Sequence, residues 1–410
     1  MSRSGPRRDG PTILGVDPRE LVAPGLAAIG LVLVGALTLG LLTGDLPFVP
    51  GGGDSDGGPF RTPTPTDVVV VDPRADVPGT ITFVKAGNVW IQRGDRAYQV
   101  TSGGRDSMPS WSPDGAWIYF VRETPRAGRA RVNGVLRGYD LLVPSIMRVD
   151  PDSEAAPETV LTGLYEKGTT VWSYFLRQPV VSPALDRLAV VSDGPDPFDS
   201  NVVLQLVDLT ARTLVRTGVV ETKPLGHQDP AWSPDGSSLL YVRNGRDGAR
   251  GAPLLMRLDL ASGTSALVAG PGYTAPSWSP DGRFIAATRT DGFGTDVVIL
   301  EAATGIELLR LTTDGHAFSP AWSPAGDAVA YLDIDRGVVD LLLQPLAGSG
   351  PDWTVGEILP LTQAAGLDAA SRPSWYIPPE ELPKPTPSPT PPATSTPSGA
   401  PASPTEPCCG

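Results

Sequence analysis

Cysteine is nearly absent from this chain of 410 residues, which has two, Cys408 and Cys409, side by side at the far C-terminal end. Adjacent cysteines cannot staple a domain, so the folded part needs no disulfide framework, and the chain has no cysteine pair with the spacing of a zinc site. We interpret the two as incidental thiols, with an intermolecular disulfide or a surface attachment as the alternative.

Histidine and positive charge are also scarce. The chain has two histidines, and its 32 Lys and Arg are outnumbered by 45 Asp and Glu, for a net charge of -13. This balance opposes the release of phosphate counterions on which nucleic-acid binding depends, so we expect no nucleic-acid partner. The sequence also lacks a G-x-S-x-G elbow, an H-E-x-x-H pair and a Walker loop, which removes the common hydrolase and nucleotide-binding signatures.

Only one long apolar run exists. Residues 21–44 carry no charged side chain, and as a helix they would span roughly 36 Å, enough for a hydrocarbon core of about 30 Å. Arginines precede the run and aspartates follow it, so the positive-inside rule predicts a cytoplasmic segment 1–20, a transmembrane helix and an extracytoplasmic remainder. A cleaved signal peptide is the alternative, but its apolar region is shorter and ends in a small-residue site that is missing here. A buried soluble helix is a third.

Low-complexity segments enclose the rest of the chain. Residues 45–79 are rich in Gly, Pro and Thr and are typical of a linker, whereas residues 378–410 are rich in Pro, Thr and Ser. Neither segment has enough apolar residues for a core, so we expect a flexible stalk and a disordered tail. The folded domain is therefore predicted over residues 80–377.

This domain repeats one motif. The stretch "PSWSPDG" and its variants recur with a proline two residues before one fixed position, which is occupied by Trp111, Val181, Trp232, Trp278, Trp322 and Trp375. A period of about 40–50 residues is typical of four-stranded propeller blades. An aromatic residue at one fixed position of each blade is interpreted as core rather than as a ligand contact.

The Ser-Pro-Asp-Gly segment is a turn. Proline presets φ at the second position, aspartate suits the third, and glycine suits the fourth. In two units the turn is degenerate: Ser182-Pro183-Ala184-Leu185 lacks the acid and the glycine, and Ser323-Pro324-Ala325-Gly326 lacks the acid. We expect packing to hold these two units together.

The strand count predicts how the domain closes. Short apolar runs after each turn read as further strands, so each unit is a four-stranded antiparallel sheet. The first unit, from Ile81, lacks a first strand, whereas the last segment, around Trp375, has a first strand and nothing after it. Pairing the two makes an all-β, six-bladed β-propeller that is closed by its N- and C-terminal strands and leaves no open sheet edge.

The repeated WSPDG motif, with its preceding proline and short following strand, resembles the TolB-like β-propeller family, whose repeats are similar in style to the WD type. The resemblance covers roughly residues 80–377 and implies six blades and an extracytoplasmic setting. The protein for which the family is named is a soluble periplasmic partner in an envelope complex, and the membrane helix expected here departs from that pattern. The fold alone does not set the function, because propellers carry many different ones.

Two segments are expected to open on the same side of the disc. The loop 122–144 is rich in arginine, and the connection 163–178 is rich in aromatic residues. Arginine beside rigid aromatic side chains is typical of interaction hot spots. The candidate binding residues are Arg126, Arg131, Arg137, Trp172, Tyr174 and Arg177. The alternative is a solvated charge run over a hydrophobic plug.

The sequence thus predicts a membrane-anchored, non-catalytic scaffold that binds a protein or an envelope polymer and needs no cofactor. A metal-assisted lyase or hydrolase is the alternative, in which His227 and His316 at the channel mouth, with Asp229 or Asp314, hold a divalent ion. No third firm ligand is apparent, and loop histidines that bond to the local backbone are the simpler interpretation. A structural spacer without a specific ligand is a further possibility.

Overall fold

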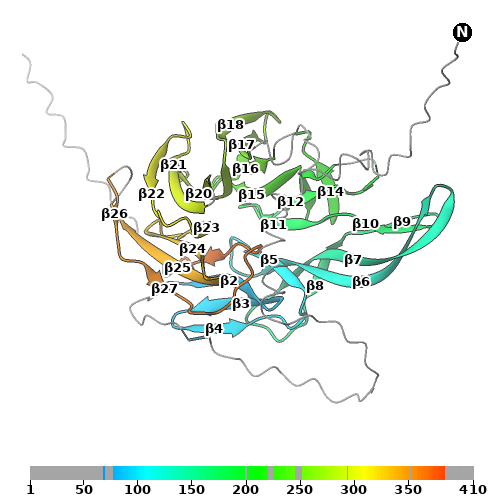
Figure 1. Cartoon of the computed structure of the whole chain (residues 1–410), viewed down its shortest axis with the longest axis horizontal. Coiled ribbons are helices and arrows are strands. Elements are labelled where there is room, and N and C mark those ends of the chain that lie inside the picture. The colour runs from blue at the N-terminus through cyan, green and yellow to red at the C-terminus, as the bar shows by residue number, and fades with distance from the viewer. Residues whose placement is uncertain are drawn as a thin grey trace, which may run out of the picture.

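The chain folds into antiparallel sheets arranged around a centre (Figure 1). The computed structural model describes residues 68–69, 77–198, 201–219, 226–244, 252–292, 294–348, 350 and 352–383. The predicted transmembrane helix 21–44 lies outside these residues, as do most of the linker 45–79 and the tail from residue 384 onward. Within the described ranges, no helix has the length and apolar character required to span a bilayer.

Each of the six sheets is one blade, and the blades are numbered here around the ring. Blade 1 contains β5 (Asp106–Trp111), β6 (Ile118–Val132), β7 (Val135–Val149) and β8 (Glu158–Thr162). Blade 2 contains β11 (Arg177–Val181), β12 (Arg187–Ser192), β13 (Val203–Asp208) and β14 (Thr213–Arg216). Blade 3 contains β15 (His227–Trp232), β16 (Ser238–Arg243), β17 (Leu254–Asp259) and β18 (Ser265–Ala269).

The remaining blades follow the same order. Blade 4 contains β19 (Tyr273–Trp278), β20 (Phe284–Asp291), β21 (Gly294–Glu301) and β22 (Glu307–Arg310). Blade 5 contains β23 (Ala317–Trp322), β24 (Ala328–Asp335), β25 (Val338–Ala347), β26 (Thr354–Val355) and β27 (Leu359–Pro360). Blade 6 contains β28 (Ser374–Tyr376), β2 (Thr80–Lys85), β3 (Asn88–Arg93), β4 (Arg96–Gln99) and β1 (Val68–Val69). The strand β1 falls within the segment expected to be a linker.

Blade 6 confirms the predicted closure. Its innermost strand is the C-terminal β28, which pairs with the N-terminal β2 so that Ile81 lies opposite Trp375. The Trp375 indole is 9% exposed, and its Nε1 donates to the carbonyl oxygen of Pro78 at 2.9 Å. Each chain end thus satisfies the edge that the other would leave open.

The repeated tryptophans lie in the core, as the sequence predicts. Trp111, Trp232, Trp322 and Trp375 are buried among apolar residues of adjoining blades. Two of the indoles also bond to the neighbouring blade: Trp232 Nε1 donates to the Val180 carbonyl at 2.9 Å, and Trp278 Nε1 donates to the Ala231 carbonyl at 3.3 Å. The Trp232 and Trp278 side chains therefore link blades 3 and 4 to the blades before them.

Each of these turns contains a hydrogen bond from serine to a carboxylate, which corrects the expectation that packing alone holds the degenerate turns. In the intact motif, the serine hydroxyl donates to the aspartate two residues later, as from Ser112 to Asp114 Oδ1 at 2.6 Å. In the two degenerate turns another carboxylate accepts this bond: Ser182 donates to Asp186 and Ser323 donates to Asp327, both at 2.8 Å. Packing alone does not hold these turns, because an acid four residues after the serine replaces the missing one.

Candidate functional site

The segment expected as a basic loop is a long β-hairpin. Strands β6 and β7 stay paired without interruption from Arg122 opposite Ser145 to Val132 opposite Val135. Asn133 (φ 52°) and Gly134 (φ 79°) form the two-residue turn. Positive φ at both turn positions is the type I′ geometry that matches the twist of a hairpin, and Asn-Gly is its preferred sequence. The expectation of a loop over 122–144 is wrong, and the paired part of β6 and β7 beyond Arg122 is called the arm below.

A second hairpin lies against the arm. Within the connection 163–178, β9 (Leu164–Lys167) pairs with β10 (Thr170–Ser173), and β10 pairs with β6 where Val171 lies opposite Arg129. The basic and aromatic segments are therefore neighbours, as the sequence predicts. Figure 1 shows both hairpins extending away from the disc on one side.

Four aromatic rings gather where the two hairpins meet. Tyr139 contacts Trp172 edge-on, with ring centroids 5.1 Å apart, and Phe198 lies 5.6 Å from Tyr165 and 6.2 Å from Trp172. Gly128 lies opposite Tyr139, and a Cβ there would come within 2.3 Å of Leu141 Cδ1. The missing side chain at Gly128 leaves room for the buried Leu141 side chain, and Phe198 is 47% exposed. These rings, Tyr139, Tyr165, Trp172 and Phe198, form the aromatic cluster.

Asp196 holds one edge of the aromatic cluster in place through two polar contacts. The Tyr165 hydroxyl donates to Asp196 Oδ2 at 3.1 Å, and Lys167 Nζ lies 3.3 Å from the same oxygen. Burial of the hydroxyl and its bond to Asp196 raise the pKa of Tyr165, so the phenol stays protonated at neutral pH. Trp172 is the one ring of the cluster that was among the candidates. Tyr139 and Tyr165 lie within the two segments that were singled out, whereas Phe198 comes from the connection between β12 and β13.

The candidate arginines are exposed on the arm and on the connection that follows blade 1. Arg126 Nη2 bonds to Glu166 Oε1 at 2.9 Å, with both side chains about half exposed. Arg131 Nη1 donates to the Gly134 carbonyl at 2.9 Å, and the Arg177 guanidinium lies 5.1 Å from the centroid of the Phe175 ring. Arg137 is exposed on β7. Arg126 thus lies next to the second hairpin through its solvent-exposed pair with Glu166, whereas Arg131, Arg137 and Arg177 are exposed elsewhere on these segments.

One candidate binding residue, Tyr174, lies in the core and not on the surface. Its side chain is 8% exposed and packs with Leu176, Val181 and other core residues between blades 1 and 2. Its hydroxyl donates to the Thr162 carbonyl at 2.7 Å. Because the ring is enclosed and its hydroxyl is satisfied, Tyr174 supports the core and is not available for surface contact.

Asp193 makes the root of the aromatic connection sensitive to pH. It is buried, its Oδ1 accepts a bond from the Phe175 amide at 2.7 Å, and burial raises its pKa to about 6.

The folded state binds the proton of the Asp193 carboxyl more tightly than the unfolded state does. The free energy of unfolding should therefore fall as pH rises from about 4 to 6, by roughly 2–3 kcal/mol in total. The Asp193→Asn variant should lose this dependence and be more stable than wild type at pH 7. Denaturant unfolding at a series of pH values measures it, and parallel profiles for variant and wild type would contradict it.

The expectation that His227 lies at the channel mouth is wrong. Its side chain is 2% exposed, and its Nδ1 accepts a bond from the Leu204 amide at 3.1 Å. The centroids of the His227 and Tyr241 rings are 4.8 Å apart. A ring nitrogen that accepts from the backbone has no free lone pair for a metal at that atom. The structure gives His227 a packing position between blades 2 and 3.

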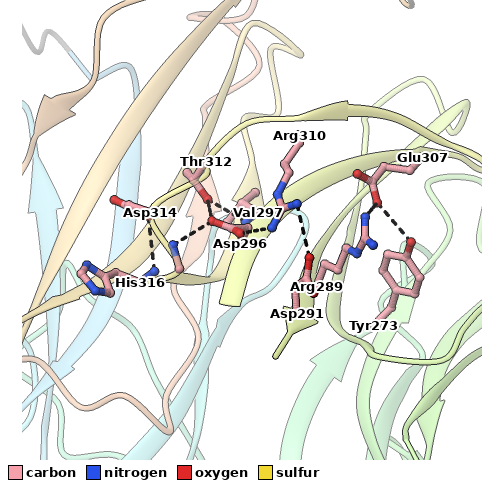
Figure 2. Close-up of polar contacts among 11 residues, drawn as sticks. Tyr273, Arg289, Asp291, Asp296, Val297, Glu307, Arg310, Thr312, Asp314 and His316 are labelled. Atoms are coloured by element: carbon pink, nitrogen blue, oxygen red, sulfur yellow. Dashed lines mark hydrogen bonds and ion pairs between the residues drawn. The ribbon is translucent and has the colours of Figure 1, made fainter. Parts of the chain in front are cut away.

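His316 lies beside a dense polar network in blade 4 (Figure 2). Its amide donates to Asp314 Oδ1 at 3.3 Å. Next to it, the buried Asp296 accepts bonds from Thr312, the Gly315 amide and the Arg310 guanidinium. Arginine, hydroxyl and amide donors already occupy this carboxylate, so it fixes the connection to blade 5. Across the described part of the chain, no three His, Cys, Asp or Glu side chains gather as a metal site.

The central channel contains a partly buried charge, Arg372, that could not be recognised from the sequence. A cavity of about 470 Å³ is lined by the innermost strands of all the blades and by Arg372. The Arg372 guanidinium reaches across the ring to the carbonyl oxygens of Pro276 at 3.3 Å and Pro230 at 3.5 Å. Burial lowers the pKa of Arg372, and its bonds link the closing segment to blades 3 and 4.

Comparison with known proteins agrees with this fold. The crystal structure of TolB from Acinetobacter baumannii aligns with a TM-score of 0.52 at 21% identity, over 74% of this chain and 68% of that one. The chain has the fold of the TolB-like six-bladed β-propellers. No family model matches the sequence.

Two further proteins that are similar to this TolB-like propeller give less information about it. The uncharacterized protein Atu1656 from Agrobacterium fabrum is 33% identical over 150 residues, which cover 34% of this chain and 40% of that protein. The chain therefore matches about two fifths of that relative's length. An oligogalacturonate lyase in complex with manganese aligns with a TM-score of 0.41 at 14% identity, over 68% of this chain and 93% of that one. A likeness of that degree bears on neither activity nor metal binding.

Proposed function

We propose that this protein is a membrane-tethered, extracytoplasmic scaffold that binds a protein or a cell-envelope polymer through the aromatic cluster and the exposed arginines Arg126, Arg131, Arg137 and Arg177. The cluster is the observation on which the proposal depends. Rigid aromatic rings supply contact area at a low entropic cost, and arginines beside them suit acidic or planar groups on a partner. Tyr139, Tyr165 and Trp172 stand on paired strands of the two hairpins, which fix the geometry of their rings better than a loop does.

The tether in this proposal is the apolar segment 21–44. The arginines before it and the aspartates after it favour a cytoplasmic N-terminus. A single-pass anchor of this kind keeps the propeller close to the outer surface of the cytoplasmic membrane. The proposed partner is therefore a protein or polymer of the envelope, and binding rather than catalysis is the proposed activity.

Capture of envelope components by the full chain tests the proposal. We expect the double variant Arg126→Ala/Trp172→Ala to retain at least tenfold less of the specific partner than wild type, because it removes a central ring and a flanking charge. The matched control is Tyr98→Ala/Arg336→Ala, which removes an exposed ring and an exposed charge in blades 6 and 5. Quantitative mass spectrometry of the retained material measures the difference. Equal retention by both double variants would remove the aromatic cluster from the proposed function.

A further inference from the structure

The outer edge of the arm is an open strand. On the side away from β6, β7 is paired with β8 only from Ser145 to Arg148. In the part of the chain that the structure describes, no strand pairs with β7 between Val135 and Val143 on that side. Long unpaired edges are templates for another strand, and soluble proteins usually cover them or interrupt them.

The bond at Pro144 shows which backbone groups this edge presents. The Pro144 carbonyl accepts a bond from the Gly163 amide at 2.7 Å, so it points away from β6. Outward and inward groups alternate along an antiparallel strand. The outward amides and carbonyls are therefore those of Leu136, Gly138, Asp140 and Leu142. Proline has no amide to donate, and Pro144 marks the point where the open edge ends.

Exposed leucines accompany these free backbone groups. Leu136 and Leu142 are each 44% exposed, and Val135 is 58% exposed. Leu136 and Leu142 project from the same face of the arm, since side chains at even spacing share a face. An edge that combines free hydrogen-bonding groups with exposed leucines has the features of a strand awaiting a partner strand.

The edge is complementary to itself. When two copies of β7 run antiparallel about a two-fold axis at Tyr139, Leu136 of one copy lies opposite Leu142 of the other, and Gly138 lies opposite Asp140. The two leucine pairs bury the exposed side chains against each other. An isologous contact of this kind closes after two copies.

Charge favours the same register. Arg129 lies directly opposite Gly138 on the arm, and Gly138 has no side chain to block its path. Asp140 of a second copy would lie one strand further on, about 10 Å from Arg129 between Cα atoms, because strands are spaced by about 4.8 Å. An extended arginine and an aspartate together span that distance. Each dimer therefore gains two such ion pairs.

We propose that the chain forms a homodimer by antiparallel pairing of β7 with β7 of a second copy, centred on Tyr139. The contact uses the outward backbone groups of β7, so it goes beyond the proposed function, which uses the side chains of the aromatic cluster. Tyr139 belongs to that cluster and also lies at the proposed two-fold axis. The Trp172→Ala change leaves every outward backbone group of β7 in place. A failure of partner binding and a failure of dimerisation are therefore distinguishable.

A cysteine scan tests the register in the full chain with Cys408→Ser and Cys409→Ser. At the two-fold axis, residue 139 faces its own copy in a non-hydrogen-bonded pair, where Cβ atoms are close enough for a disulfide. Tyr139→Cys should give a covalent dimer under mild oxidation, whereas Gly138→Cys and Asp140→Cys should not. The control Tyr98→Cys, at an exposed ring of blade 6, should give no disulfide-linked dimer. Cross-linking strongest at 138 or 140, or at no position of the scan, would overturn the proposed pairing.

A charge exchange gives a second test that needs no oxidation. Arg129→Asp alone and Asp140→Arg alone each place two repulsive pairs in the dimer and should weaken dimerisation about tenfold or more. An equimolar mixture of the two variants should recover it, because a heterodimer contains two attractive pairs. Sedimentation velocity measures the dimer fraction, with Arg336→Asp as the control at a charge that is fully outside the arm. If the mixture dimerises no better than the single variants, the Arg129 and Asp140 contact is wrong.

Discussion

Replacing Trp375 with alanine should lower the free energy of unfolding by about 3–5 kcal/mol. The Trp375 indole fills the core between blades 5 and 6, where Ile81, Phe83 and Leu361 are fully buried. Its loss leaves a cavity and removes the bond from Nε1 to the Pro78 carbonyl. The consequence exceeds that of an ordinary core truncation, because Trp375 belongs to the strand that closes the ring.

The closing segment is bonded to blade 1 as well as to β2 of its own blade. Ser374 Oγ accepts a bond from the Trp111 amide at 3.1 Å, and Ser371 Oγ accepts a bond from the Met108 amide at 3.0 Å. On its outer face, Tyr376 packs against Trp111 with ring centroids 5.4 Å apart. Truncation after residue 371 should therefore do more than Trp375→Ala: it exposes the edge of β2 and should cause aggregation.

Urea unfolding of the full chain, followed by circular dichroism, measures the effect of Trp375→Ala. Trp375→Phe serves as a control that keeps a ring at the site and should lose less stability. Trp172→Ala serves as a second control, because the partly exposed Trp172 lies outside the disc and its loss should cost about 1 kcal/mol or less. A change below 1 kcal/mol for Trp375→Ala would mean that the closure does not stabilise the propeller.

Replacing Arg122 with alanine should lower the free energy of unfolding by about 3–5 kcal/mol. Arg122 holds Asp106 through both carboxylate oxygens, with Nε at 2.6 Å from Oδ1 and Nη2 at 2.7 Å from Oδ2. The Asp106 side chain has no exposed surface, so removing the guanidinium leaves a charge that water cannot reach. The bond to Asp106 also raises the pKa of Arg122.

This pair joins the arm to the disc. Arg122 is the last residue of β6 before the arm, Asp106 begins β5, and the Asp106 amide donates to the Gly87 carbonyl of blade 6 at 2.7 Å. We expect Arg122→Ala/Asp106→Asn to recover part of the loss, because the double variant has no buried charge to strand. Arg93→Ala, which breaks the exposed pair with Asp152, should cost less than about 1 kcal/mol. Similar losses for Arg122→Ala and Arg93→Ala in denaturant unfolding would contradict the role given to Asp106.

The surface arginines differ from Arg122 although all of them occur in one run of sequence. Arg126 pairs with a half-exposed glutamate, whereas Arg122 pairs with a fully buried aspartate. The run itself contains no sign of this difference, because burial of Asp106 depends on the packing of blade 6 against blade 1. Charge composition therefore located the basic segment but could not divide it into structural and surface residues.

The arm could have been predicted from the sequence. Asn133 and Gly134 lie between stretches of alternating character, which is a strong hairpin signal. The aromatic cluster could not, because Tyr139 and Phe198 belong to different blades and each reaches Trp172 only in the folded protein. Tyr174 illustrates the reverse case, since the same connection carries one ring into the core and another to the surface.

The sequence by itself determined the six-bladed ring, its closure by the two chain ends and the buried tryptophans. These features follow from a turn that is repeated at a regular interval. The conformation of such a turn depends on the residues at its own consecutive positions, so it can be predicted from the sequence. The tertiary structure decided which carboxylate replaces a missing one in a turn, which arginine is buried, and which rings gather on the arm. Those outcomes depend on contacts between residues far apart in the chain, where packing and desolvation select among side chains that look alike in the sequence.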